Sequence, residues 1–234
     1  LDGLVGEIMN RTGQDVSGFD YSFQIQLPDE WDENIAAKNF GVTAAVETSF
    51  CNPEWITACN KMDGVIVPSN FTAAVLKNSG ELKTRIHVIP ESFPEYFERE
   101  PKKTKFLNCK AKRNFLLFGQ LTAPSPDLDR KNTFNAVKWF CENFKNRKDV
   151  GLIIKTNMGT NSTLDKKVTV QTLKKVLDTV REGKYPKVTL LHGNINDADL
   201  FKLYCDKTMV GLISATRGEG YGLPMIEAAA ACKE

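Results

Sequence analysis

The strongest constraint on the fold is an alternation of short apolar runs with helical patterns through the second half of the chain. The apolar runs are short and strand-like, and we expect strands at residues 115–119, 150–155, 188–192 and 209–214. Between and after them, apolar residues at helical spacing predict helices at residues 132–146, 170–180, 196–204 and 225–232. Nearly continuous apolar strands that alternate with helices are typical of a parallel sheet covered on both faces. We therefore predict a doubly wound, Rossmann-like domain.

The first half of the chain shows the same alternation less regularly. Strands are expected at residues 21–26, 40–47, 64–67 and 85–89, and helices from Pro28 through Asn39, at residues 53–61 and after Pro68. Residues 90–113 hold three prolines and a charged stretch, which indicates a linker or crossover. The predicted fold class is α/β with two Rossmann-like units, residues 1–105 with the linker and residues 106–234.

Charge and composition narrow the classes of function. The 31 Lys and Arg residues against 29 Asp and Glu give a net charge of +2, which argues against a nucleic-acid partner. No apolar run approaches the ~20 residues that span a bilayer. The six cysteines form no C-x-x-C pair, so we expect scattered buried thiols and a reducing, cytoplasmic compartment. Both ends of the sequence look cut, and we expect a fragment.

The glycine-rich segment at residues 217–228 carries the clearest chemistry. Its three glycines allow a sharp turn, and Pro224 suits a first helical turn. The free N–H groups of that helix N-terminus are a natural seat for phosphate. Glu219 precedes the helix, and Glu227 points back toward its start because helical side chains lean toward the N-terminus. Two carboxylates beside a phosphate seat suit a nucleotide sugar.

Here the sequence resembles a known family. Glu219 and Glu227 form an E-x7-E pattern in the setting E-G-Y-G-L-P-M-I-E-A, which resembles the retaining GT-B glycosyltransferases of the "glycosyl transferases group 1" family. Weaker similarities lie at Phe118-Gly119 with Arg130-Lys131, at 152–155, at His192-Gly193 with Asn196, and at 40–49 with 63–69. The resemblance covers most of residues 40–234. It implies a GT-B-like fold, with the donor site in residues 106–234 and a partial acceptor side in residues 1–105.

The resemblance also implies a role for each matching residue. Glu219 would hydrogen-bond hydroxyls of the donor sugar, Glu227 would hold the ribose, and Lys131 would neutralise the leaving diphosphate. The remaining residues expected to bind the donor are Gly119, Gln120, Arg130, Lys155, Gly220, Tyr221, Gly222 and Leu223. The N–H groups of Tyr221, Gly222 and Leu223 would meet the diphosphate.

Two positions need separate comment. The family usually has an arginine where this chain has Gln120, and Arg130 is the candidate replacement cation. On the acceptor side, Glu47 or Thr48 follows a predicted strand where the family often has a polar residue facing the reacting carbon. We name Glu47, together with Glu219 and Lys131, as a candidate catalytic residue.

The resulting hypothesis is hexosyl transfer from a UDP-, GDP- or ADP-sugar to an unknown glycan, lipid or small-molecule acceptor, with retention of configuration. It requires no cofactor and no metal. The alternative is a non-catalytic nucleotide-sugar-binding fragment or module. A dinucleotide-binding oxidoreductase is disfavoured, because its glycine fingerprint follows the first strand of the domain and not the fourth.

Four further patterns have simpler interpretations. Asp127-Leu-Asp129 and Asp197-Ala-Asp199 match a D-x-D metal motif, but we expect a solvated turn and a helix cap respectively. The lysine-rich stretches 102–105 and 110–113 are expected to be solvated linker charge, with weak membrane-surface contact as the alternative.

Overall fold

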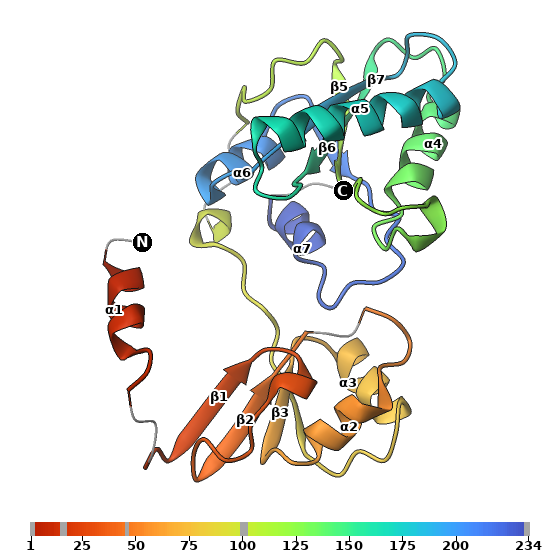
Figure 1. Ribbon diagram of the computed structural model, residues 1–234. Coiled ribbons are helices and arrows are strands. Elements are labelled where there is room, and N and C mark those ends of the chain that lie inside the picture. Colours follow the sequence, from red (N-terminus) through yellow and green to blue (C-terminus); the bar gives the residue numbers. More distant parts are fainter. Residues whose placement is uncertain (1–2, 15–17, 45–46, 99–102, 232–234) are drawn as a thin grey trace. The chain divides into compact units, whose positions relative to one another are not determined.

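The computed structural model describes residues 3–14, 18–44, 47–98 and 103–231, and it divides into two compact units, Leu1–Glu91 and Ser92–Glu234 (Figure 1). Each unit is described separately. The division lies earlier than the predicted one between residues 105 and 106. Phe97 explains the difference, because its buried ring packs edge-on against Phe201 at 5.2 Å and Tyr204 at 5.6 Å between ring centroids, both in the C-terminal unit.

The N-terminal unit is a four-stranded parallel sheet in the order β1-β2-β3-β4 (Figure 1). Its elements are α1 (Leu4–Arg11), β1 (Tyr21–Ile25), the 3₁₀ turn η1 (Pro28–Glu30), β2 (Lys38–Val42), α2 (Pro53–Cys59), β3 (Gly64–Val67), α3 (Asn70–Asn78) and β4 (Ile86–Val88). The core lies between the sheet and the helices α2 and α3, where Val65, Val67 and Leu76 are fully buried. The four predicted strands are present, whereas α1 was not predicted.

The predicted helix from Pro28 through Asn39 is wrong. Only η1 is helical, and β2 already begins at Lys38. Side chains of the neighbouring strands satisfy the loop backbone instead of helical hydrogen bonds. The amide of Gln24 donates to the carbonyl of Asp32 at 2.7 Å and accepts from its N–H at 2.8 Å, and the Asn39 amide donates to the carbonyls of Glu33 and Ala36.

The C-terminal unit contains the predicted alternation of strands and helices. Its elements are the 3₁₀ turn η2 (Glu95–Glu98), β5 (Arg113–Phe118), the 3₁₀ turn η3 (Pro126–Leu128), α4 (Thr133–Asn143), β6 (Val150–Thr156), α5 (Thr163–Val180), β7 (Lys187–His192), α6 (Asp197–Tyr204), β8 (Met209–Leu212) and α7 (Leu223–Ala230). The strands are parallel in the order β7-β6-β5-β8. The predicted end of the last helix at Cys232 lies outside the described residues.

Both faces of this sheet are covered (Figure 1). Leu117 and Ile154 pack with α4 and α5, whereas their strand neighbours Leu116 and Ile153 pack with α6 and α7. Successive residues of a strand point to opposite faces, so each strand serves two apolar layers. The doubly wound α/β prediction is thus confirmed.

The segment before β5 is fixed to the C-terminal unit. The carboxylate of Asp206 accepts the N–H groups of Phe106 and Leu107, each at 2.8 Å, and Thr104 N–H donates to the carbonyl of Cys205 at 2.9 Å. The side chains of Lys103 and Lys105 are exposed, as expected, while Lys102 lies outside the described residues. Within the described part of the chain, no helix has the length and apolar character needed to cross a membrane.

Candidate functional site

The candidate site lies where the chain order of the C-terminal sheet reverses. β5 is the first strand of the unit, with β6 and β7 on one side and β8 on the other. In open α/β sheets, ligands bind outside the carboxyl ends of the strands at such a switch point. The loops that leave β5 and β8 there, residues 119–132 and 213–222, carry most of the predicted donor-binding residues.

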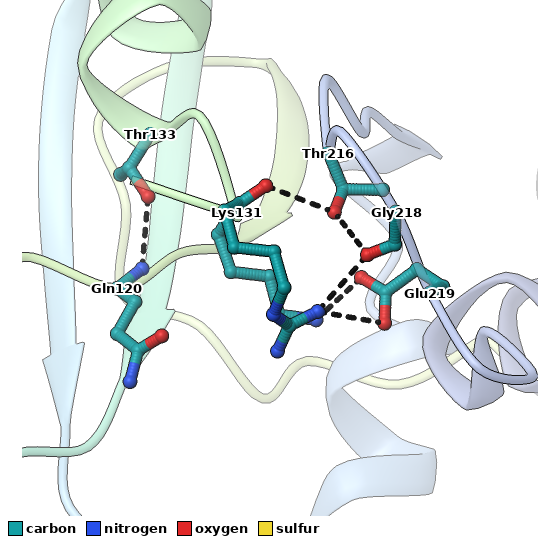
Figure 2. Close-up of polar contacts among 7 residues, drawn as sticks. Gln120, Lys131, Thr133, Thr216, Gly218 and Glu219 are labelled. Atoms are coloured by element: carbon teal, nitrogen blue, oxygen red, sulfur yellow. Dashed lines mark hydrogen bonds and ion pairs between the residues drawn. The ribbon is translucent and has the colours of Figure 1, made fainter. Parts of the chain in front are cut away.

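Backbone hydrogen bonds hold these two loops together. The N–H of Arg217 donates to the carbonyl of Arg130 at 2.9 Å, and the hydroxyl of Thr216 lies 3.2 Å from the same carbonyl and 3.0 Å from that of Gly218 (Figure 2). The guanidinium of Arg217 also donates to the carbonyl of Asp127. Residues almost ninety positions apart in sequence are thus brought to one edge of the sheet.

The loop after β5 is shaped by the start of α4. Thr133 is fully buried; its N–H donates to the Asp129 carboxylate at 2.6 Å, and its hydroxyl accepts the N–H of Gln120 at 2.9 Å (Figure 2). A Cβ on Gly119 would lie 2.7 Å from Cγ2 of Thr133, so only glycine fits this approach. The prediction of a solvated turn is wrong for Asp129, which is 6% exposed and caps α4.

Three charged side chains meet between the loops. Nζ of Lys131 lies 2.5 Å from Oε1 of Glu219, and Nη1 of Arg130 lies 3.4 Å from Oε2 of the same carboxylate (Figure 2). Nη1 of Arg130 also donates to the carbonyl of Gly218 at 3.0 Å. The Glu219 side chain is 18% exposed. The structure therefore brings together three of the residues that sequence reasoning selected.

The predicted phosphate seat lies at the N-terminus of α7. Gly222 adopts a φ of +86° at the N-cap position, and Pro224 follows in the first turn. The segment Gly220–Leu223 leads from Glu219 directly into the helix, so its N–H groups belong to the end that favours anions. Their contact with a diphosphate stays a prediction.

Glu227 lies deeper than the other candidate residues. It is 7% exposed, and its Oε2 accepts a hydrogen bond of 3.0 Å from the hydroxyl of Tyr204 at the end of α6. Burial raises the pKa of Glu227, while the Tyr204 hydrogen bond acts in the opposite direction. A contact between Glu227 and a ribose stays a prediction.

Lys155 belongs to a neighbouring pocket at the carboxyl ends of β6 and β7. This pocket has a volume of about 370 Å³ and includes His192 and the segment 193–196. Nζ of Lys155 donates to Oδ1 of Asn157 at 2.8 Å, and burial lowers the pKa of this lysine. Nε2 of His192 is buried without a hydrogen-bond partner among the described residues. Residues 192–196, which include one of the weaker similarities to the family, thus line a cavity.

The acceptor-side candidate belongs to the N-terminal unit. Glu47 follows β2 and is half-buried, and the hydroxyl of the adjacent Thr48 donates to the carbonyl of Phe50 at 2.6 Å. Its role stays a prediction. Sequence reasoning missed Thr133 and Thr216, which fix the two loops. Neither belongs to a charged or glycine-rich pattern, so no sequence signal distinguishes them from the other threonines of the chain.

The comparisons with known proteins report similarity of fold. No protein-family model matches the chain, and no curated protein matches it by sequence. Among solved structures, it is similar to OtsA in its apo form (11% identity, TM-score 0.61) and to sucrose-phosphate synthase from Thermosynechococcus elongatus (14% identity, TM-score 0.63). Each alignment covers 100% of this chain and 59% of the other.

A third similar structure is trehalose-6-phosphate synthase with bisubstrate glycomimetics, at 11% identity and a TM-score of 0.62, covering 98% of this chain and 59% of that one. The chain thus spans less than two thirds of the length of these proteins. At such low identity the similarity concerns the fold alone. The two parallel α/β units have the Rossmann-like architecture of the GT-B fold.

Proposed function

We propose that the chain belongs to a glycosyltransferase that moves a hexose from a nucleotide-diphosphate sugar to an acceptor with retention of configuration. The observation that carries this proposal is the meeting of Lys131, Arg130 and Glu219 at the switch point of the sheet, beside the N-terminus of α7. A diphosphate requires cations and N–H donors, and a sugar requires hydrogen-bond acceptors. This arrangement offers both within one site.

In the proposed reaction, negative charge grows on the diphosphate as the sugar leaves. Lys131 and Arg130 stabilise that charge together with the N–H groups of residues 221–223. Glu219 accepts hydroxyls of the sugar. Glu227 accepts a ribose hydroxyl, and the pocket beside Lys155 takes the nucleoside. Gly119, which has no side chain, lets the backbone of the loop after β5 approach the phosphates, and Gln120 follows it in that loop.

Two of the similar structures support the choice of donor and the stereochemical outcome. One was determined with UDP-2-fluoro glucose bound, and another concerns glycosyl transfer with retention by trehalose-6-phosphate synthase. These statements belong to those proteins. Carried to this chain, they favour a UDP-sugar donor within the proposed class.

The proposal also covers the acceptor side. The acceptor is a glycan, a lipid or a small molecule with a free hydroxyl, and Glu47 faces the reacting carbon from the acceptor side.

The proposal extends to the conditions of the reaction. No metal or cofactor is required. Contact with a membrane surface through the lysine-rich stretches is weak or absent. The compartment is the reducing cytoplasm, which is supported by the free thiols among the described residues, at Cys51, Cys59, Cys109, Cys141 and Cys205.

A thermal-shift titration against UDP, GDP, ADP, their sugars and NAD tests the proposal. A ligand at about 100 times its dissociation constant stabilises the native state by about 2.7 kcal/mol. We expect one nucleoside diphosphate and its sugar to raise Tm, and Lys131→Ala to abolish that shift. Glu182→Gln is the matched control, because it removes one charge of an exposed ion pair in the same unit.

Two outcomes contradict the proposal: no shift with any nucleotide, or a shift with NAD alone. If a nucleotide does bind, an assay for release of nucleoside diphosphate in the presence of acceptors separates a transferase from a non-catalytic binding module. Turnover identifies a transferase, whereas binding without turnover identifies a nucleotide-sugar-binding module.

A further inference from the structure

The charged cluster at the switch point is partly neutralised within the protein, because one carboxylate pairs with two cations. Glu219 pairs with Lys131 at 2.5 Å and with Arg130 at 3.4 Å. In the proposed function, the two cations bind the diphosphate, whereas Glu219 binds the sugar. The structure pairs both cations with Glu219, so the groups proposed to bind phosphate and the group proposed to bind sugar are partners within the protein itself.

The space around this ion pair is also too small for a diphosphate. Lys131 and Glu219 line a pocket together with Phe118, Pro224 and Met225, and its free volume is about 10 Å³. A volume of that size holds one water molecule at most. A diphosphate group therefore enters this pocket only when the contact between Nζ of Lys131 and the Glu219 carboxylate opens.

We propose that Glu219 is an internal anion that holds Lys131 and Arg130 until the donor's diphosphate replaces it. This inference rests on the proposed function. On binding, both cations exchange one anionic partner for another, and the released Glu219 carboxylate loses its two positive neighbours. A partly buried carboxylate without a partner is costly, so the exchange is most favourable when a new hydrogen-bond donor reaches Glu219.

The hydroxyls of an attached sugar supply that donor, whereas a bare nucleoside diphosphate does not. Glu219 therefore couples the sugar subsite to the phosphate subsite. The coupling selects intact sugar donors over the nucleoside diphosphate that remains after transfer, and it promotes release of that product. Selectivity of this kind comes from a penalty on the wrong ligand, in addition to contacts with the right one.

Calorimetric titration of the full chain tests the exchange, with inorganic pyrophosphate, UDP, GDP, ADP and the matching sugar donors as probes at one fixed salt concentration. We expect Glu219→Gln to bind pyrophosphate and the cognate nucleoside diphosphate about fivefold more tightly than the original chain, since the internal competitor is gone. Binding of the sugar donor should be unchanged or weaker. Glu182→Gln, which removes the carboxylate from the exposed Lys145 pair at 2.5 Å, should change neither affinity.

Two more variants keep the test decisive. In Lys131→Met/Glu219→Gln, the gain in pyrophosphate affinity should disappear, because the cation that Glu219 competes for is absent. If Glu219→Gln does not fold, as judged by circular dichroism, Glu219→Asp retains the charge on a shorter side chain, and it should show a smaller gain of the same sign.

The outcomes separate this inference from the proposed function. If the original chain binds a nucleoside diphosphate and Glu219→Gln binds it equally or more weakly, the exchange is overturned and the proposed function stands. If no nucleotide binds any variant, the proposed function fails, and the pyrophosphate titration alone decides the exchange. If Glu219→Gln then binds pyrophosphate no more tightly than the original chain does, the exchange is overturned as well.

Discussion

The hydroxyl oxygen of Tyr204 lies 3.0 Å from Oε2 of Glu227 and 3.1 Å from the carbonyl oxygen of Pro224. This side chain at the end of α6 therefore holds both the first turn of α7 and a carboxylate farther along the same helix. Tyr204 is 1% exposed, and its ring stacks on Phe118 with 6.0 Å between ring centroids. The Glu227 carboxylate is consequently held in place by its hydrogen bond to a buried core residue.

The first prediction concerns the conflict between stability and binding at Glu227. Burial raises the pKa of this carboxyl in the folded state. The free energy of unfolding therefore falls as pH rises from the unfolded pKa through the folded one, because the buried carboxylate must ionise. Glu227→Gln removes that cost at pH 7. We expect Tm to rise by about 2–4 °C, while affinity for the nucleoside diphosphate falls about tenfold because a ribose hydroxyl loses its charged acceptor.

Calorimetric unfolding and nucleotide titration measure the two effects, with the exposed Glu182→Gln as the control that should change neither. A lower Tm together with unchanged affinity would show that Glu227 serves only the fold.

The second prediction separates positioning from packing at Tyr204. Tyr204→Phe keeps the ring but removes the hydrogen bond that lowers the pKa of Glu227, so that pKa should rise further. Nucleoside-diphosphate affinity should then begin to fall at a higher pH than in the original chain as the solution is acidified. A titration series from pH 8 to pH 5 measures the midpoint. A parallel loss of affinity at every pH would indicate a purely structural role.

The third prediction concerns Asp206, whose carboxylate fixes the segment before β5. Burial opposes its ionisation, but hydrogen bonds from the N–H groups of Leu107, Thr208 and Phe106 and from the Thr208 hydroxyl prevail and lower its pKa. Its contribution to stability is therefore complete above the unfolded pKa of about 3.9 and is lost as pH falls below it.

Asp206→Asn should reduce the free energy of unfolding at pH 7 by about 2 kcal/mol, and the difference from the original chain should shrink below about pH 4. Denaturant unfolding at both pH values measures it. Asp149→Asn is the matched control, because Asp149 also has a lowered pKa, of about 2, but its side chain is 38% exposed beside Arg147. An equal loss in both variants would show that burial of Asp206 contributes nothing.

The fourth prediction concerns metal. The proposed reaction places the diphosphate on Lys131, Arg130 and the N–H groups of residues 221–223, so EDTA should leave nucleoside-diphosphate release unchanged. Release assays with and without EDTA, followed by addition of Mn²⁺, measure this. Loss of activity that Mn²⁺ restores would favour a metal-binding role for one of the D-x-D patterns, at Asp127–Asp129 or at Asp197–Asp199.

The alternation of strands and helices in the C-terminal unit was predictable because both periodicities are strong there. The strand at residues 150–155 is apolar up to Lys155, and the structure buries every residue of β6. The helix α5 begins seven residues before the predicted apolar face. Its start at Thr163 depends on a capping box between Ser162 and Asp165, a polar signal that apolar spacing does not report.

Long-range side-chain hydrogen bonds account for what the sequence did not predict. The error at residues 28–39 arises because Gln24 and Asn39 satisfy the loop from neighbouring strands, and no local pattern encodes that contact. The candidate site shows the same limit. The glycine spacing selected Glu219 and Glu227, whereas the partnership of Glu219 with Lys131 depends on how two loops almost ninety residues apart meet.

The fifth prediction tests the close approach of α4 to the end of β5. A Cβ on Gly119 would lie 2.7 Å from Cγ2 of Thr133, so Gly119→Ala should displace the start of α4, lower Tm and weaken nucleoside-diphosphate binding at least tenfold. Thr133→Ser removes that methyl group but keeps the hydroxyl that accepts the Gln120 N–H, and the double variant should recover part of the affinity. Gly6→Ala, where an added Cβ meets nothing within 4 Å, is the control. Calorimetry and titration measure both properties. If adding Thr133→Ser to Gly119→Ala recovers no affinity, the contact between Gly119 and Thr133 does not shape the loop after β5.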